Sequence, residues 1–170
     1  MSWLGNIMKA RKWVVNASPI ITLAKISRQS LLLDLSTEVV IPQEVYDEIC
    51  AGPKDDPAVR WLKKDGRKWL YPSESFHKDI APWDLGKGES AVLSYALQHP
   101  GFSAIIDDRA ARNCAQSFGI PHLGTIGVIL LGKKEKKLLE VKPVLDELIT
   151  AGTRISPDLI EMALALAGEK

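Results

Sequence analysis

The side chains of this sequence that could do chemistry are carboxylates and one amide at the boundaries of predicted elements. Asn16 follows the apolar run WVV, and Asp107 and Asp108 follow the apolar run AII. Glu48 lies in a predicted helix, and Glu89 lies in the first turn of another. Hard divalent cations such as Mg²⁺ and Mn²⁺ take oxygen ligands and keep several waters. Widely separated carboxylates at element boundaries therefore suggest a site for such a cation.

Each carboxylate also has a structural explanation. Glu89 could complement the dipole of its helix, and Glu48 could be a solvated charge that Glu44 mildly repels. For these two residues taken alone, the structural explanation is the better one. Asp108 stands where a helix N-cap is expected. Asp107 is the hardest to explain in this way, because a charge that ends a buried strand needs a partner or a metal.

The elements that must position these residues alternate between strands and helices. Predicted strands cover residues 13–15, 38–41, 67–72, 103–107 and 120–124. Predicted helices cover 18–26, 30–35, 42–52, 58–64, 84–98, 108–119, 125–138, 141–152 and 156–169, and 73–83 is expected to be an exposed connection. This alternation predicts a parallel sheet joined by right-handed crossovers. Ligand sites in such sheets lie outside the carboxyl ends of the strands, so Asn16 and Asp107 should face the same crevice.

The helix predicted over residues 18–26 has the clearest start. Ser18 is expected to be its N-cap and Pro19 its first helical residue. Ile20, Leu23 and Ala24 are expected to share its buried face.

Composition narrows the class of protein. The chain has 170 residues, the length of one compact domain, and a formal charge of +1, so any nucleic-acid partner must be recognised by local patches. Cys50 and Cys114 lack metal-ligand spacing and are expected to be buried, reduced thiols. The apolar runs are too short to cross a bilayer, and the first residues do not follow a signal-peptide pattern. We therefore expect a cytoplasmic protein with no membrane partner.

Five segments occur in the order seen in PIN-domain proteins. They are VVNASPIITLAKI, VIPQEVYDEI, LGKGESAVLSYAL, IIDDRAARNCAQSFGI and LGTIGVIL. The chain resembles a prokaryotic branch of uncharacterised PIN-like proteins related to the VapC toxins. On this resemblance, residues 12–170 form a single PIN-like domain, and residues 1–11 form an N-terminal extension of unknown role.

The resemblance implies a three-layer α/β/α fold with a central parallel sheet of four to five strands. It also implies a ribonuclease that uses Mg²⁺ or Mn²⁺ to cut single-stranded RNA, often as the toxin of a toxin–antitoxin pair. Because dimerisation is common in the family, we expect a homodimer, and an antitoxin-like protein is a further expected partner.

The family's acidic positions can be placed on this sequence. Glu48 and Glu89 fall on two metal ligands, and the last falls on Asp107 or Asp108. Asp107 is favoured by its place at the strand end, and Asp108 by the arginine that follows it. We therefore predict a catalytic metal site that contains these carboxylates.

The sequence departs from the family at the first acidic position. That position falls on Asn16, and a nearby hydroxyl of the family falls on Ser18. An asparagine keeps an oxygen that can bind a metal, but it carries no charge and cannot bridge two metals as a carboxylate can. The nuclease activity is therefore predicted to be reduced or lost. The alternatives are an inactive module that binds RNA or a protein partner, and a structural or dimerisation protein whose carboxylates are helix caps.

Basic residues are clustered only locally. Arg109 and Arg112 directly follow the proposed metal ligands and are predicted to reach phosphate oxygens of a nucleic acid. The runs KKDGRK and GKKEKK are better explained as solvated surface. Among the five tryptophans only Trp83, next to DLGKGES, is a candidate for stacking on a base.

Overall fold

The centre of the computed structural model, which describes residues 10–169, is a five-stranded sheet. The strands are β1 (Lys12–Val15), β2 (Glu38–Pro42), β3 (Leu70–Tyr71), β4 (Phe102–Ile105) and β5 (His122–Leu123). They lie in the order β3-β2-β1-β4-β5, and every neighbouring pair is parallel. The predicted parallel sheet is confirmed. Most of the N-terminal extension predicted over residues 1–11 lies outside the described residues.

Helices cover both faces of this sheet. They are α2 (Ala17–Lys25), α3 (Ser30–Asp34), α4 (Gln43–Cys50), α5 (Pro57–Lys64), α6 (Lys87–Gln98), α7 (Arg109–Ser117), α8 (Thr125–Lys134), α9 (Lys142–Thr150) and α10 (Pro157–Leu166). Two 3₁₀ turns, η1 (Gly66–Trp69) and η2 (Ala81–Trp83), complete the described elements. None of the helices in residues 10–169 is long and apolar enough to cross a membrane.

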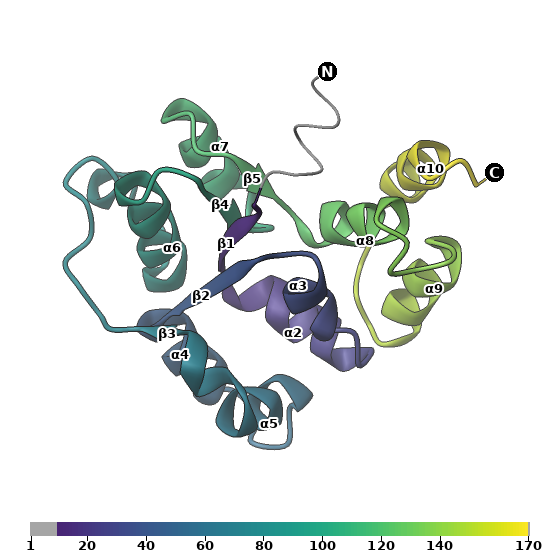
Figure 1. The fold of residues 1–170 in the computed structure, drawn as a ribbon, viewed down its shortest axis with the longest axis horizontal. Coiled ribbons are helices and arrows are strands. Elements are labelled where there is room, and N and C mark those ends of the chain that lie inside the picture. Colours follow the sequence, from purple (N-terminus) through teal and green to yellow (C-terminus); the bar gives the residue numbers. More distant parts are fainter. Residues whose placement is uncertain (1–9, 170) are drawn as a thin grey trace.

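The order of the strands explains the layers. The chain runs from β1 through β2 to β3 at one edge, then crosses back to β4 and β5. Because crossovers are right-handed, this reversal places α6 and α7 on the face opposite α2. Figure 1 shows α6 and α7 on one side of the strands and α2, α3 and α8 on the other. The three-layer α/β/α architecture is therefore confirmed.

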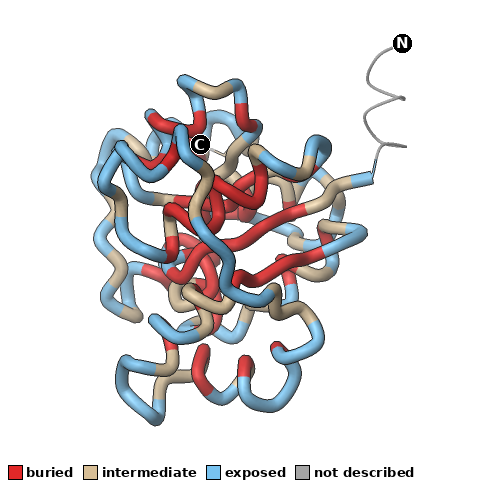
Figure 2. The backbone as a smooth tube through the Cα atoms, turned by 90° about the vertical axis from the view of Figure 1, so that its left-hand side faces the viewer, coloured by how far each residue is buried: buried red, intermediate tan, exposed pale blue. Residues whose placement is uncertain are grey.

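The core follows the strands and the inner faces of the helices. Figure 2 shows the buried backbone concentrated in the centre of the molecule. In α2 the predicted face of Ile20, Leu23 and Ala24 is buried. Cys114 is buried and Cys50 is half-buried, and both are free thiols, so the prediction holds fully only for Cys114.

Two predicted elements have different boundaries in the structure. The first half of the strand predicted over residues 67–72 is the end of the 3₁₀ turn η1, and only Leu70 and Tyr71 pair with β2. The helix predicted from residue 84 begins at Lys87, because Asp84 has a left-handed backbone with φ of 54°. Local turn conformations therefore set both boundaries: a four-residue 3₁₀ turn before β3 and one left-handed residue before α6.

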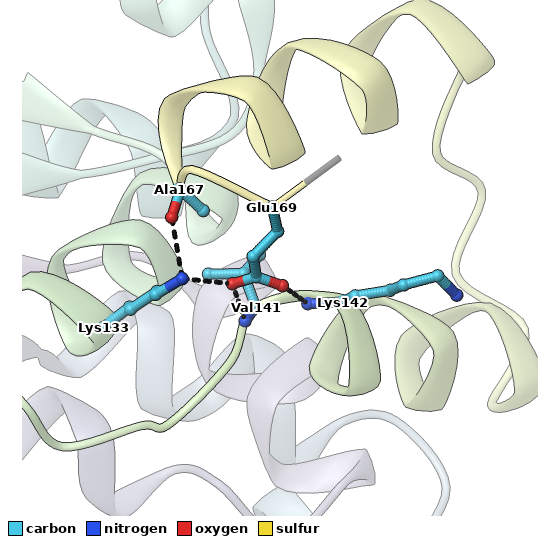
Figure 3. A network of polar contacts seen from close by, with 5 residues as sticks. All are labelled: Lys133, Val141, Lys142, Ala167 and Glu169. Atoms are coloured by element: carbon cyan, nitrogen blue, oxygen red, sulfur yellow. Dashed lines mark hydrogen bonds and ion pairs between the residues drawn. The ribbon is translucent and has the colours of Figure 1, made fainter.

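The C-terminal end is fastened by Glu169, as Figure 3 shows. Its Oε2 accepts hydrogen bonds from Lys133 Nζ and from the Val141 backbone N–H, both at 2.7 Å. Its Oε1 accepts from the Lys142 backbone N–H at 2.9 Å, and Lys133 also donates to the Ala167 carbonyl. We call these five residues the Glu169 latch. The bond from Lys133, followed by that from Val141, lowers the pKa of Glu169 from 4.5 to about 2.

Candidate metal centre

Asn16 and Asp107 lie next to the point where the strand order reverses, between β1 and β4. The carboxyl ends of β1 and β4 are adjacent, with Val15 opposite Ile105. The pairing continues one residue further, because the Asn16 backbone N–H donates to the Ile105 carbonyl at 3.0 Å. Such reversal points are where open α/β sheets bind ligands. Asn16 and Asp107 both follow these strand ends, in agreement with the sequence pattern.

Asn16 is a buried residue, with only 1% of its surface exposed. It is the N-cap of α2, yet its side chain makes no capping bond. Its Nδ2 instead donates to Glu89 Oε2 at 2.8 Å. Its Oδ1 is buried and has no hydrogen-bond partner among residues 10–169. Buried polar atoms are almost always paired, so this oxygen needs an explanation, and a cation is one.

Glu48 of α4 approaches the same point across Gly88 of α6. A side-chain carbon on Gly88 would lie 2.9 Å from Glu48 Oε1 and 3.0 Å from Asn16 Oδ1. The two oxygens therefore border one small space that is open only because residue 88 is a glycine. Gly86 makes similar room for Glu89, since a side-chain carbon there would overlap with its Oε1.

The two carboxylates of this group repel each other. Partial burial, and then the charge of Glu89, raises the pKa of Glu48. Within residues 10–169, neither Glu48 nor Glu89 forms an ion pair with a lysine or arginine. The side-chain amide of Asn16 donates a hydrogen bond to Glu89.

Asp107 has a different environment. Its Oδ2 accepts hydrogen bonds from Ser18 Oγ at 3.0 Å and from Thr125 Oγ1 at 2.7 Å. Its Oδ1 accepts from the Thr125 backbone N–H at 2.7 Å. A side-chain carbon on Gly124 would lie 3.0 Å from this Oδ1, so the glycine keeps room for the carboxylate. Asp107 thus joins the end of β4 to the starts of α2 and α8.

The predicted capping role of Ser18 is wrong. The helix begins at Ala17 with Asn16 as its N-cap, and the Ser18 hydroxyl donates to Asp107. Asp108 does cap a helix, because its Oδ2 accepts from the Ala111 backbone N–H at 3.0 Å. This is the structural alternative for Asp108, and Asp107 is the one of the two acids that lines the groove next to α8.

A groove of about 490 Å³ opens beside Asp107. Arg112 of α7, the start of α8 and the segment 153–162 line it. Arg109 lines the adjoining hollow, so the two predicted basic residues lie near the crevice. Arg154 adds a positive charge that the sequence pattern missed, since it stands alone in a loop. Trp83 is 39% exposed and packs edge-on against Phe118, outside this groove.

The predicted acids do not form one cluster. Within the described part of the chain, no group of three or more His, Cys, Asp and Glu side chains is placed to hold a metal ion. The structure instead gives a group of Asn16, Glu48 and Glu89 around Gly88, and separately the bonded Asp107. We call the first group the open carboxylate group. Its two carboxylates and one carbonyl oxygen fit a single hard cation that keeps water ligands.

Thr125 and Gly88 are the residues of this region that sequence reasoning missed. Thr125 begins α8 and is separated from the end of β5 by one residue, and free backbone N–H groups at such a helix start can bind a carboxylate. That position is the signal that could have identified it. Gly88 has no such signal, because its importance depends on which side chains from other elements lie against it.

One comparison with known proteins identifies the family of this chain. A family model described as a PIN domain matches residues 12–169. No curated protein matches the chain. The matched range includes every strand and helix that the structure describes.

Proposed function

This chain belongs to the PIN-domain family, and we propose that it is an endoribonuclease that uses Mg²⁺ or Mn²⁺ to cut single-stranded RNA. The observation that carries the proposal is the buried Oδ1 of Asn16, which receives no hydrogen bond from the described part of the chain and borders one space with Glu48 Oε1. Such oxygens are the ligands that these cations prefer. We assign the cation to the open carboxylate group of Asn16, Glu48 and Glu89.

The residues of the group set the strength of this site. A bound cation would polarise a phosphoryl oxygen and favour attack by water. Glu48 and Glu89 supply two negative charges, and Asn16 supplies only an uncharged oxygen. The site should therefore bind its cation more weakly than a centre with three carboxylates, and the activity should be reduced. Asp107, already bonded by three donors, positions the starts of α2 and α8 in this proposal.

The basic groove beside Asp107 supports an RNA substrate. Arg109, Arg112 and Arg154 are exposed, and none of them forms an ion pair within residues 10–169. Arginines without acidic partners can bind phosphate oxygens in a bidentate manner. They lie along the groove that continues from the carboxyl end of β4.

Cleavage of a labelled single-stranded RNA tests the proposal. We expect cleavage in Mn²⁺, none in EDTA, and a loss of roughly 100-fold or more in Glu48→Gln, because the cation supplies several kcal/mol of transition-state stabilisation. Asp47→Asn is the matched control, since it removes the same charge from the neighbouring position of α4. Cleavage that persists in EDTA, or that is equal in Glu48→Gln and the native protein, would refute a nuclease that depends on a cation at this site.

A second candidate is an inactive module that binds RNA or an antitoxin-like protein, as in a prokaryotic toxin–antitoxin pair. The hydrogen bond from Asn16 to Glu89 favours it, because that bond already occupies one of the two carboxylates. An RNA-binding module should bind without cutting, and its affinity should fall steeply between about 50 and 200 mM salt. Arg154→Gln should lower the salt slope by about 1, whereas Arg60→Gln on α5 should not. Binding that does not change with salt would indicate a protein partner.

A further inference from the structure

We infer that Asn16 takes over the structural role of a cation in the open carboxylate group, so that the fold of the site does not depend on bound metal. This inference rests on the assignment of Asn16, Glu48 and Glu89 to the proposed cation site. It concerns how the protein keeps two carboxylates in place without a cation. Three ionised carboxylates contain no hydrogen-bond donor of their own that could do so.

The chemistry of the amide carries the argument. An asparagine offers a donor on one branch and an acceptor on the other, whereas an aspartate offers only acceptors. Here the donor branch bonds Glu89 Oε2 at 2.8 Å, and the acceptor branch faces the space that it shares with Glu48 Oε1. In this orientation Glu89 receives a hydrogen bond from the amide, and a bound cation is not needed to hold that carboxylate in place.

The surroundings of Asn16 hold this donor in position. The residue is 1% exposed, and its backbone N–H is bonded to the Ile105 carbonyl at 3.0 Å. Hydrogen bonds from a fixed donor to a charged acceptor are among the strong ones in proteins. An aspartate at position 16 would put a third carboxylate beside Gly88 and remove the donor. A cation, or the protonation of one of the carboxylates, would then have to reduce the repulsion within the group.

Thermal unfolding in EDTA and in a Mn²⁺ series tests this inference. We expect the melting temperature of the native protein to change by less than about 2 °C, because a weakly bound cation stabilises little by mass action. Asn16→Asp should melt roughly 5–15 °C lower in EDTA, the range for loss of a buried charged contact in a chain of this length. Mn²⁺ should restore most of that difference in a saturable manner.

Two variants distinguish the Mn²⁺-dependent loss of stability in Asn16→Asp from a general destabilisation of the fold. Asn16→Ala neither donates nor binds a metal, so it should melt lower than the native protein and should not respond to Mn²⁺. Asn113→Asp adds the same charge on the exposed face of α7 and should change neither value. The inference is overturned if Asn16→Asp is as stable as the native protein in EDTA. It is also overturned if the native protein gains as much from Mn²⁺ as the variant does.

A second measurement covers the case in which Asn16→Asp does not fold. The side-chain amide of Asn16 can be followed by NMR in the native protein, with its signal assigned by its absence in Asn16→Ala. In EDTA we expect two distinct protons that exchange slowly with water, because one is bonded to Glu89. Rapidly exchanging protons would contradict the inference. A failure of RNA cleavage leaves these outcomes unchanged, so the nuclease and this inference can fail separately.

Discussion

The Glu169 latch and the open carboxylate group hold carboxylates in opposite ways. Glu169 is surrounded by donors: a lysine and two backbone N–H groups at the start of α9. Glu48 is instead close to Glu89 and to the carbonyl oxygen of Asn16. The pKa values move accordingly, since that of Glu169 is lowered to about 2 and that of Glu48 is raised.

This difference distinguishes carboxylates that stabilise the fold from carboxylates that are free to bind a ligand. A carboxylate that accepts hydrogen bonds from its neighbours stabilises the folded chain by itself, and a ligand would have to replace those hydrogen bonds. A carboxylate that faces other acceptors destabilises the folded chain until a cation or a donor reaches it. By this criterion Asp107, which accepts three hydrogen bonds, belongs with Glu169 and not with Glu48.

Asp107→Ala tests this grouping and should have the largest effect of the substitutions that compare these two regions. Removing the carboxylate leaves both donors of the buried Thr125 without their acceptor, so the free energy of unfolding should fall by about 2–4 kcal/mol. The loss should be the same in EDTA and in Mn²⁺. Urea unfolding in both conditions measures it.

The neighbouring Asp108→Ala is the control for this substitution. Asp108 only caps α7, so its removal should lower the free energy of unfolding by about 1 kcal/mol. Equal losses at the two positions would show that the bonds of Asp107 are no more than a helix cap. A loss at Asp107 that appears only in Mn²⁺ would place this residue with the open carboxylate group.

Glu169→Gln tests the Glu169 latch through the pH dependence of the free energy of unfolding. Because the folded pKa lies below the unfolded value of 4.5, the charge of Glu169 adds stability above pH 4.5, and this is lost as the pH falls toward about 2. At pH 7 the variant should be about 1–2 kcal/mol less stable, since it weakens bonds to a lysine and to a helix N-terminus. Urea unfolding at several pH values should show this gap closing toward pH 2. Glu161→Gln, on the exposed side of α10, should show no gap at any pH.

Much of the fold could be predicted from the sequence, because it depends on local patterns. Apolar runs such as 13–15 and 38–41 marked the central strands, and the face of Ile20, Leu23 and Ala24 marked the inner side of α2. The edge strand β3 was less predictable, since it pairs through only two residues and the preceding turn η1 has no apolar pattern.

The site was predictable only in part. Asn16 and Asp107 could be placed at the same edge of the sheet because both follow strand ends, and topology alone brings those ends together. The separation of the open carboxylate group from the hydrogen-bonded Asp107 could not be predicted, because it depends on side-chain donors that come from distant elements. Thr125 is 18 positions from Asp107, and Asn16 is 73 positions from Glu89. Separations of this kind leave no periodic signal in the sequence.

Glu48→Gln should show the smallest effect, with a sign opposite to that of Glu169→Gln. Because the folded pKa of Glu48 is raised, the stability associated with this group is fully present below pH 4.5 and is lost as the pH rises through the folded pKa. Replacing the carboxylate by an amide removes this loss. The variant should therefore be more stable than the native protein at pH 7 in EDTA, and the two should converge below pH 4.5. The gain should stay below about 1 kcal/mol, because the side chain is largely exposed and solvent screens its repulsion from Glu89.

Mn²⁺ makes this last comparison decisive. The native protein should gain stability from the cation by mass action, whereas Glu48→Gln has lost one of the two charges that hold it and should gain less. The advantage of the variant should therefore shrink or reverse as Mn²⁺ is added at pH 7. Asp47→Asn removes the same charge one position away, where the side chain accepts a hydrogen bond from Gln43, and should show no advantage in either condition. If Glu48→Gln is less stable than the native protein at pH 7 in EDTA, Glu48 is a satisfied carboxylate like Glu169, and the distinction between the two regions fails.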